Sequence, residues 1–300
     1  MKKILSKVKL IYYVLLPLLL YFGQRSYIAQ DEGYYALQAK WILLNNNWIA
    51  PLWFQSPNFD RTIGIQWIIA FFNKIFGDSI FVTHLPSIIF GFIILYLTYK
   101  FTFIIEHIKY KWISPLILVT TYLWLNNVHL STQDIPLLGL ELIGIYNLYK
   151  IKSHNQKLSI FLSSFWIGPA IFIKSFMALL PIIAILPYVF VFKQYIFKNK
   201  YFYLGLITGF LPLIYWLMLC IKTYGTESIY TIFYKLKYLN SSDQYSQPFY
   251  YYLWNIPINT MPWIIFSLAG FYYVSIKENI EEKFLLLLYP LILIILLSIF

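Results

Sequence analysis

The sequence of 300 residues is poor in charge and in cysteine. Its single cysteine, Cys220, lies inside an apolar run, which excludes an internal disulfide and any metal site built from cysteines. Charged residues make up 12% of the chain, about half the share of a soluble domain, whereas 60% of the residues are hydrophobic and 21% are aromatic. This composition predicts an integral membrane protein.

Acidic residues are also scarce, because 12 of them stand against 23 basic residues and leave a net charge of +11. The lysines occur in short clusters between apolar runs, which is typical of cytoplasmic loops and unlike a stripe that follows nucleic-acid phosphates. We therefore expect membrane lipids, and no nucleic acid, among the partners. The four histidines are scattered at His84, His107, His129 and His154, which argues against a metal site made mainly of histidine.

Apolar runs recur along the whole chain, and a helix needs about 20 such residues to cross a bilayer. The pattern predicts an all-α fold, a polytopic transmembrane helix bundle. No small-residue cleavage site follows the basic first segment, so the first span is expected to stay in the protein. The nine expected spans are Leu10–Phe22, Ile80–Ile105, Trp112–Asn126, Ile135–Tyr149, Leu158–Ile173, Phe176–Phe192, Tyr201–Ile221, Trp254–Ser275 and Phe284–Phe300.

The basic residues predict the orientation. With the N-terminus in the cytoplasm, fifteen of the 23 basic residues fall on inner loops and eight on outer segments, as the positive-inside rule requires. The loop 23–79 is then outside. It holds four of the twelve acids, and because acids contribute little to topology, this enrichment needs another cause.

The outer loop 23–79 is not a plain tether. From Tyr34, apolar residues recur at Leu37, Trp41, Leu44 and Trp48, which is the spacing of one helix face. A second, largely apolar run extends from 60 to 76. The loop is therefore expected to contain two amphipathic helices lying in the membrane interface, joined by a turn at 51–57.

The outer loop carries two candidate sites. Asp31 and Glu32 either cap a helix N-terminus or supply a carboxylate that accepts a proton from an acceptor hydroxyl. Asp60 and Arg61 form either a local ion pair or a phosphate clamp, since the guanidinium fork suits phosphate better than the point charge of lysine.

Two further candidates lie at span ends. Asp134 precedes the span that begins at Ile135, and it is either an N-cap or part of a pocket at the outer mouth. Lys174 interrupts an apolar run, where a cation usually pairs with an acid or an anionic ligand. The alternative for Lys174 is that its side chain reaches out to the interface.

A series of short motifs runs in order along the chain. The motifs are Asp31-Glu32-Gly33-Tyr34-Tyr35-Ala36, Asn47-Trp48, Phe59-Asp60-Arg61, Phe76-Gly77, His84-Leu85-Pro86-Ser87, Thr132-Gln133-Asp134-Ile135-Pro136-Leu137, Lys174, Gln247-Pro248-Phe249-Tyr250-Tyr251-Tyr252 and Pro262-Trp263. Together, and over nearly the whole chain, they resemble the membrane glycosyltransferases with the GT-C fold. That family includes aminoarabinose (lipid A) transferases and protein O-mannosyltransferases.

The resemblance implies a polyprenyl-phosphate sugar donor, a lipid or protein acceptor and an active site on the outer face of a bacterial inner membrane. It implies catalytic roles for one group of residues and substrate binding for another. A divalent cation at the outer carboxylates is compatible with this chemistry. The catalytic candidates are Asp31, Glu32 and Asp134, and the substrate-binding candidates are Tyr35, Asp60, Arg61 and Lys174.

The chain departs from the family pattern in places. Thr62-Ile63 stands where the family commonly has two prolines, and Tyr34 stands where some members have arginine. Relatives continue through further spans and often a soluble outer domain, whereas this chain stops at Phe300 within an apolar run. Residues 1–300 are therefore expected to form one transmembrane glycosyltransferase domain, as a fragment or a shortened product.

These observations predict an inverting glycosyltransferase that moves a sugar from polyprenyl phosphate to a lipid or protein acceptor. The alternative is a membrane protein that binds or translocates a lipid-linked sugar without catalysis. Such transporters tend to carry inverted repeats, and the sequence shows no such repeat.

Overall fold

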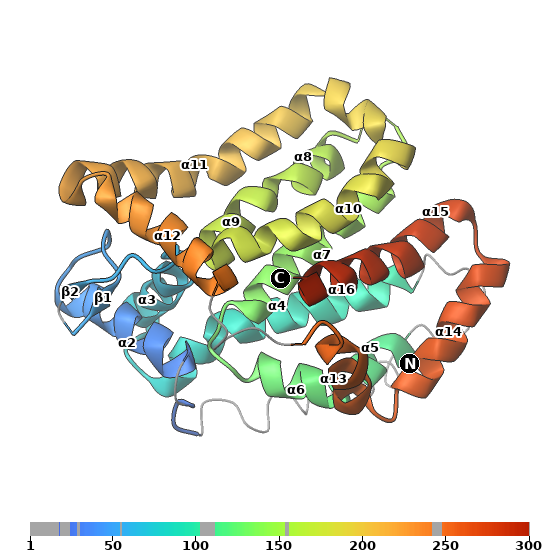
Figure 1. Ribbon diagram of the computed structural model, residues 1–300, viewed down its shortest axis with the longest axis horizontal. Coiled ribbons are helices and arrows are strands. Elements are labelled where there is room, and N and C mark those ends of the chain that lie inside the picture. The colour runs from blue at the N-terminus through green and yellow to red at the C-terminus, as the bar shows by residue number, and fades with distance from the viewer. Residues whose placement is uncertain are drawn as a thin grey trace, which may run out of the picture.

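The computed structural model describes residues 18, 25–28, 31–54, 56–102, 112–153, 156–241 and 248–299. In this part of the chain nearly every element is a helix, which confirms the predicted all-α class (Figure 1). The first elements are α2 (Asp31–Leu44), β1 (Leu52–Trp53), β2 (Ser56–Pro57), α3 (Gly64–Phe76), α4 (Ile80–Phe101), α5 (Ile113–Val119), α6 (Tyr122–Val128) and α7 (Asp134–Lys150). The later ones are α8 (Lys157–Phe165), α9 (Ile167–Lys174), η1 (Ser175–Ala178), α10 (Leu179–Phe192), η2 (Gln194–Lys198), α11 (Lys200–Tyr224), α12 (Glu227–Ser241), α13 (Tyr251–Thr260), α14 (Ile264–Lys277), α15 (Ile280–Lys283), η3 (Phe284–Leu288) and α16 (Tyr289–Ile299).

The contacts of α7 define the two ends of the bundle. At one end, Lys174 at the close of α9 binds Asp134, the first residue of α7. At the other end, Lys193, which follows α10, donates to the carbonyl oxygen of Ile151 at 2.8 Å, just beyond α7. The chain therefore reverses direction at Lys174–Ser175, and α8–α9 and α10 are two separate passes. We call the end that carries Lys174 and α2 the α2 end.

Four segments of the described chain are long and apolar enough to cross a membrane: Ile80–Phe101, Lys157–Phe192, Lys200–Tyr224 and Ile280–Ile299. The chain is therefore an integral membrane protein. Because Lys157–Phe192 includes the reversal, it contains two of the predicted spans. The predicted first span, Leu10–Phe22, lies outside the described residues apart from Leu18, and the count of nine spans stays a prediction.

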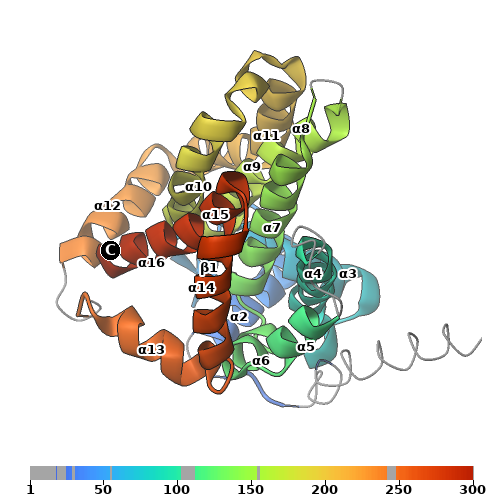
Figure 2. The ribbon, with the colours of Figure 1, turned by 90° about the vertical axis from the view of Figure 1, so that its right-hand side faces the viewer.

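Two predicted spans are wrong as continuous helices. The stretch Trp112–Asn126 is divided into α5 and α6, because Thr121 adopts an extended conformation with ψ 127°. The stretch Trp254–Ser275 breaks at Met261, which is extended with ψ 144° and precedes Pro262. Proline disfavours the helical conformation in the residue before it, which explains the break. Figure 2 shows α14, after this break, at the face of the molecule nearest the viewer.

The two helices predicted in the outer loop are present as α2 and α3, joined by the antiparallel pair β1–β2. The face of α2 that packs against the protein is not the face marked by the apolar spacing from Leu37 to Trp48. Its buried face carries Glu32, Gln38 and Ile42, whereas Leu37 is half-buried and Leu44 is 70% exposed. The polar members of the buried face have hydrogen-bond partners on α3 and α4, so this face is mixed rather than apolar.

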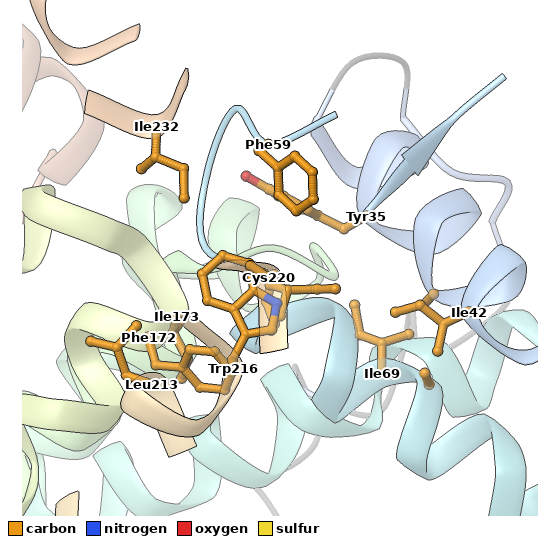
Figure 3. Close-up of a cluster of buried hydrophobic side chains, with 14 of the residues drawn as sticks. Tyr35, Ile42, Phe59, Ile69, Phe172, Ile173, Leu213, Trp216, Cys220 and Ile232 are labelled. Atoms are coloured by element: carbon orange, nitrogen blue, oxygen red, sulfur yellow. The ribbon is translucent and has the colours of Figure 1, made fainter. Parts of the chain in front are cut away.

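The loop is fastened to the bundle by a hydrophobic core at the α2 end. Figure 3 shows Trp216 of α11 at its centre, with Phe172 of α9 on one side and Ile69 of α3 on the other. The Trp216 indole also donates to the backbone carbonyl of Ile49 at 2.8 Å. Phe59 packs edge-on against Tyr224, with 5.3 Å between ring centroids. Burying these large side chains stabilises the loop on the spans, since each contributes about 1.5–3 kcal/mol.

The start of α3 lies in unusually close contact with the end of α9. A Cβ atom on Gly64 would lie 2.3 Å from the carbonyl oxygen of Phe172, closer than real Cβ atoms approach any atom. Next to it, the amide of Thr62 donates to the Ser175 hydroxyl at 3.0 Å, and the amide of Ser175 donates to the Thr62 hydroxyl at 3.2 Å. The segment that carries Asp60 and Arg61 is therefore fixed to the reversal at Lys174.

Replacing Gly64 tests this close contact. Gly64→Ala should lower the free energy of unfolding by about 1–3 kcal/mol, because the added methyl group must displace backbone. Thermal unfolding in detergent, followed by tryptophan fluorescence, measures the change. The control is Gly270→Ala in α14, where a Cβ meets nothing within 4 Å. An equal loss of stability in both variants would contradict the role of Gly64.

Candidate active site

Arg61 lies at the centre of the first cluster of predicted site residues. Its Nε donates to Asp60 Oδ2 at 3.2 Å, and its Nη1 donates to Asp31 Oδ1 at 3.4 Å and to the Tyr35 hydroxyl. The guanidinium carbon lies 5.3 Å and 5.4 Å from the ring centroids of Tyr34 and Tyr35. The structure thus brings Asp31, Tyr35, Asp60 and Arg61 together, from two segments about thirty residues apart.

The two acids around Arg61 differ in exposure. The Asp60 side chain is 12% exposed and also accepts a hydrogen bond from the Tyr34 hydroxyl at 3.1 Å. The Asp31 side chain is 68% exposed and stands at the first residue of α2. Asp60 is therefore placed to hold Arg61, while Asp31 keeps most of its carboxylate open to the surroundings.

A second ion pair joins Asp134 and Lys174. Asp134 begins α7, and its Oδ2 also accepts from the Thr132 hydroxyl at 3.2 Å. Burial opposes ionisation of Asp134, but the Lys174 ammonium and these hydrogen bonds outweigh it and lower the pKa of this carboxyl. Lys174 is thus not a lone snorkelling cation, because it has an acidic partner from another helix.

The two ion pairs lie close to one another. The pKa of the Tyr35 phenol is raised, mainly because the side chain is buried. The charge of Arg61 lowers this pKa, whereas the charges of Asp31 and Asp134 both raise it further. Asp134 is therefore near enough to Tyr35 for its charge to act there. Because Thr62 and Ser175 are hydrogen-bonded, their chain neighbours Arg61 and Lys174 are also held in one region. Six of the seven predicted residues share this site.

Glu32, the seventh predicted residue, points elsewhere. It is 2% exposed, and its carboxylate faces five nitrogen atoms. Two belong to the Arg25 guanidinium, Nη1 at 2.7 Å and Nη2 at 3.1 Å. The others are the amides of Ile28 at 2.7 Å and Ser131 at 2.9 Å, and His84 Nε2 at 2.7 Å. Burial raises its pKa, but the hydrogen bonds from His84, Arg25 and the two amides outweigh this effect and lower the pKa to about 2.

The sequence predicts no site role for three residues that support the site, Arg25, His84 and Ser175. His84 and Arg25 bind Glu32, and Ser175 binds Thr62. The sequence held one signal for Ser175, namely that Thr62 stands where the family commonly has proline. Proline has no amide hydrogen and could not donate to the Ser175 hydroxyl, as Thr62 does. Tyr252 of α13 is another such residue. Burial and Tyr251 raise the pKa of the Tyr252 phenol, and Lys174 lies close enough to lower it.

The sequence leaves the cofactor open, with a divalent cation compatible with the outer carboxylates. In that part of the chain no three His, Cys, Asp or Glu side chains are grouped so that they could hold a metal ion. Asp31 and Asp60 share Arg61, and Asp134 pairs with Lys174. In this structure these acids face basic side chains rather than one another.

The fold and the site together define a class of protein: an all-α membrane protein with paired acids and bases at one end of its helix bundle. The chain belongs to the dolichyl-phosphate-mannose-protein mannosyltransferase family, whose model matches residues 60–218, more than half of its length. The matched segment includes Asp60, Arg61, Asp134 and Lys174.

Named relatives are similar over most of this chain. The undecaprenyl phosphate-alpha-4-amino-4-deoxy-L-arabinose arabinosyl transferase 2 of Proteus mirabilis is 24% identical over 250 residues, which cover 78% of this chain and 44% of the relative. The corresponding transferase of Pseudomonas aeruginosa is 21% identical over the same shares. The chain therefore spans less than half the length of these relatives.

Two solved structures share the fold. ArnT from Cupriavidus metallidurans bound to undecaprenyl phosphate superposes with a TM-score of 0.82 over 98% of this chain and 55% of that one, at 15% identity. The apo state of the same protein gives a TM-score of 0.72 over 99% and 60%, also at 15% identity. These similarities confirm the all-α membrane architecture.

The low pKa of Glu32 predicts how stability depends on pH. The unfolded chain takes up a proton on this carboxyl near pH 4.5, whereas the folded chain holds it ionised down to about 2. The stabilisation is therefore present above about pH 4.5 and is lost as the pH falls through about 2. Melting temperatures should fall on acidification, and Glu32→Gln should show a lower melting temperature near neutral pH and a shallower fall. A Glu32→Gln profile that matches the wild-type profile would contradict this.

Proposed function

We propose that this chain is a glycosyltransferase that moves a sugar from a polyprenyl phosphate to a hydroxyl group of a lipid or protein acceptor. The observation that carries the proposal is the exposed Asp31 carboxylate beside Arg61, with Lys174 in the same region. Family membership supports it, as do relatives named for undecaprenyl phosphate-linked aminoarabinose. The solved structure with the same fold is described as bound to undecaprenyl phosphate.

In the proposed reaction the acceptor oxygen attacks the anomeric carbon of the donor sugar. The bond between that carbon and the phosphate oxygen breaks, and the polyprenyl phosphate leaves with the bonding electron pair. The acceptor proton passes to the Asp31 carboxylate, which acts as general base. Attack from the face opposite the leaving group inverts the anomeric centre.

Arg61 and Lys174 are the proposed partners of the leaving phosphate. Both are cations fixed by neighbouring residues, so they would stabilise the charge that grows on the phosphate oxygen as the bond breaks. Arg61 contacts Asp31 at 3.4 Å, its longest charged contact. A phosphate at Arg61 would compete for that contact and leave the Asp31 carboxylate available to the acceptor. Asp60, whose side chain is 12% exposed and lies 3.2 Å from Arg61 Nε, would keep the guanidinium in place. Tyr35 and Asp134 would complete the pocket.

The α2 end of the bundle is proposed to face the outer side of a bacterial inner membrane. The support is the distribution of the basic residues, which favours a cytoplasmic N-terminus with most lysines on the same side. The donor sugar is left as a pentose or a hexose, because the relatives are named for an aminopentose and the family model for mannose. Both donors therefore belong in the assay.

Binding or translocation of a lipid-linked sugar without catalysis is the second candidate function. It would use Arg61 and Lys174 but would not need the exposed carboxylate of Asp31. Its signature is donor binding without sugar transfer at saturating acceptor. The exposure of Asp31 beside the two cations favours transfer.

Asp31→Asn tests the general base. The amide cannot accept the proton, so kcat should fall by about a hundredfold to ten-thousandfold while undecaprenyl phosphate still binds. Radiolabelled sugar transfer by the full chain in detergent or nanodiscs measures kcat. Asp78→Asn is the matched control, because Asp78 pairs with Lys40 in an exposed ion pair of the same loop. Wild-type turnover by Asp31→Asn would remove Asp31 as base.

Arg61→Gln and Lys174→Gln test the phosphate contacts. Each should weaken undecaprenyl phosphate binding by about tenfold to a hundredfold, since a hydrogen bond to a charged group contributes about 1.5–3 kcal/mol. Microscale thermophoresis or equilibrium binding in nanodiscs measures the affinity. Lys40→Gln, at a half-exposed site, is the control and should bind like wild type. Wild-type affinity in both test variants would overturn the phosphate assignment.

A further inference from the structure

A second charged cluster lies behind the proposed active site, and its centre is buried. Glu32 follows Asp31 in the sequence, but its side chain is 2% exposed and faces away from Arg61. Each of its two oxygens accepts from Arg25, and each accepts at least one more hydrogen bond. Such a carboxylate is saturated with donors and has no oxygen left for an acceptor hydroxyl.

The donors to Glu32 come from three separate parts of the chain. Arg25 and Ile28 belong to the segment before α2, His84 belongs to the first turns of α4, and Ser131 belongs to the loop between α6 and α7. Arg25 also binds the loop between α6 and α7 directly, because its Nη2 donates to the carbonyl oxygen of His129 at 2.7 Å.

Neighbouring contacts hold the same three parts together. The Ser131 hydroxyl donates to the carbonyl oxygen of Thr83 at 2.7 Å, next to His84 in α4. The Tyr27 ring stacks on the His84 ring with 6.0 Å between centroids, and its hydroxyl donates to Thr83 Oγ1 at 3.1 Å. His84 Nδ1 lies 2.6 Å from the carbonyl oxygen of Ile80, which fixes the ring within α4.

These connections join the two halves of the proposed site, which are the cluster around Asp31 and Arg61 and the Asp134–Lys174 pair. Asp31 is the residue before Glu32, and Asp134 lies three residues after Ser131. The carboxylate of Glu32 therefore ties the start of α2, which carries Asp31, to the loop that leads into Asp134 and its partner Lys174. A change at Glu32 would move both halves relative to each other.

We infer that Glu32, Arg25 and His84 form a positioning network that sets the distance between Asp31 and the Asp134–Lys174 pair, and that Glu32 is not itself a proton acceptor. This inference rests on the proposed function for its kinetic consequence. Its structural consequence, a link between the 25–28 segment and the 129–134 loop through one carboxylate, stands independently of any reaction.

Glu32→Gln is the test, and Glu227→Gln is the matched control, because Glu227 also lies in the first turn of a helix but is exposed. Hydrogen exchange of the full chain in nanodiscs, followed by mass spectrometry, reports the amides of Ile28 and Ser131. In Glu32→Gln both should exchange at least about tenfold faster, although they are far apart in the sequence, because both lose the carboxylate that accepts from them. Faster exchange at only one of them, or at neither, would overturn the network.

Kinetics test the positioning role. Glu32→Gln should lower kcat by about tenfold to a hundredfold through misplacement of Asp31, while the KM for the donor stays within about threefold. A kcat within about twofold of wild type would overturn it. If wild type itself transfers no sugar from either donor, the proposed function fails, and the exchange result still decides the network.

Arg25→Gln provides a milder variant if Glu32→Gln does not fold. The Arg25 side chain is 30% exposed, and its removal leaves three of the five contacts to Glu32 in place. We expect the same pattern with smaller size: faster exchange at Ser131 and a lower kcat at an unchanged donor KM. Wild-type exchange and wild-type kcat in this variant would contradict the inference.

Discussion

The close contact between the 60–64 segment and the chain reversal at Lys174–Ser175 is the constraint on which the rest of the site depends. Two reciprocal hydrogen bonds join Thr62 and Ser175, and Gly64 lets the start of α3 lie directly against the carbonyl of Phe172. Because of this contact, a residue of the outer loop, Arg61, lies in the same region as a residue between two membrane passes, Lys174. The hydrophobic core around Trp216 then holds the loop on the spans.

Several charged residues at the α2 end lie in ion pairs. The acids and bases at the α2 end form two kinds of cluster, which differ in burial. Around Arg61 and Lys174 the carboxylates of Asp31 and Asp134 remain partly exposed, at 68% and 46%, so a ligand can compete for their partners. Around Glu32 the carboxylate is enclosed and fully hydrogen-bonded, which suits structural support. Breaking a buried pair of this kind typically costs about 3–5 kcal/mol.

Much of this arrangement could be predicted from the sequence, and the exceptions have physical reasons. Six site residues could be grouped from the sequence, because the predicted topology puts them at one end of the bundle and their short motifs occur in a recognisable order. They are Asp31, Tyr35, Asp60, Arg61, Asp134 and Lys174. The direction of Glu32 could not be predicted, since successive helix residues point about 100° apart and only tertiary packing decides which one is buried. The helix break at Thr121 was missed because hydropathy does not report backbone conformation. The break at Met261 was missed although Pro262 after it was a signal in the sequence.

We propose that Arg61 and Lys174 hold the phosphate of a polyprenyl donor beside Asp31, and this arrangement can be observed directly. Its most direct test is a cryo-electron-microscopy structure of the full chain with undecaprenyl phosphate. We expect phosphate oxygens about 2.7–2.9 Å from the Arg61 guanidinium and the Lys174 ammonium, with the Asp31 carboxylate no longer bound to Arg61. A phosphate bound away from both cations, with the Arg61–Asp31 contact intact, would contradict it.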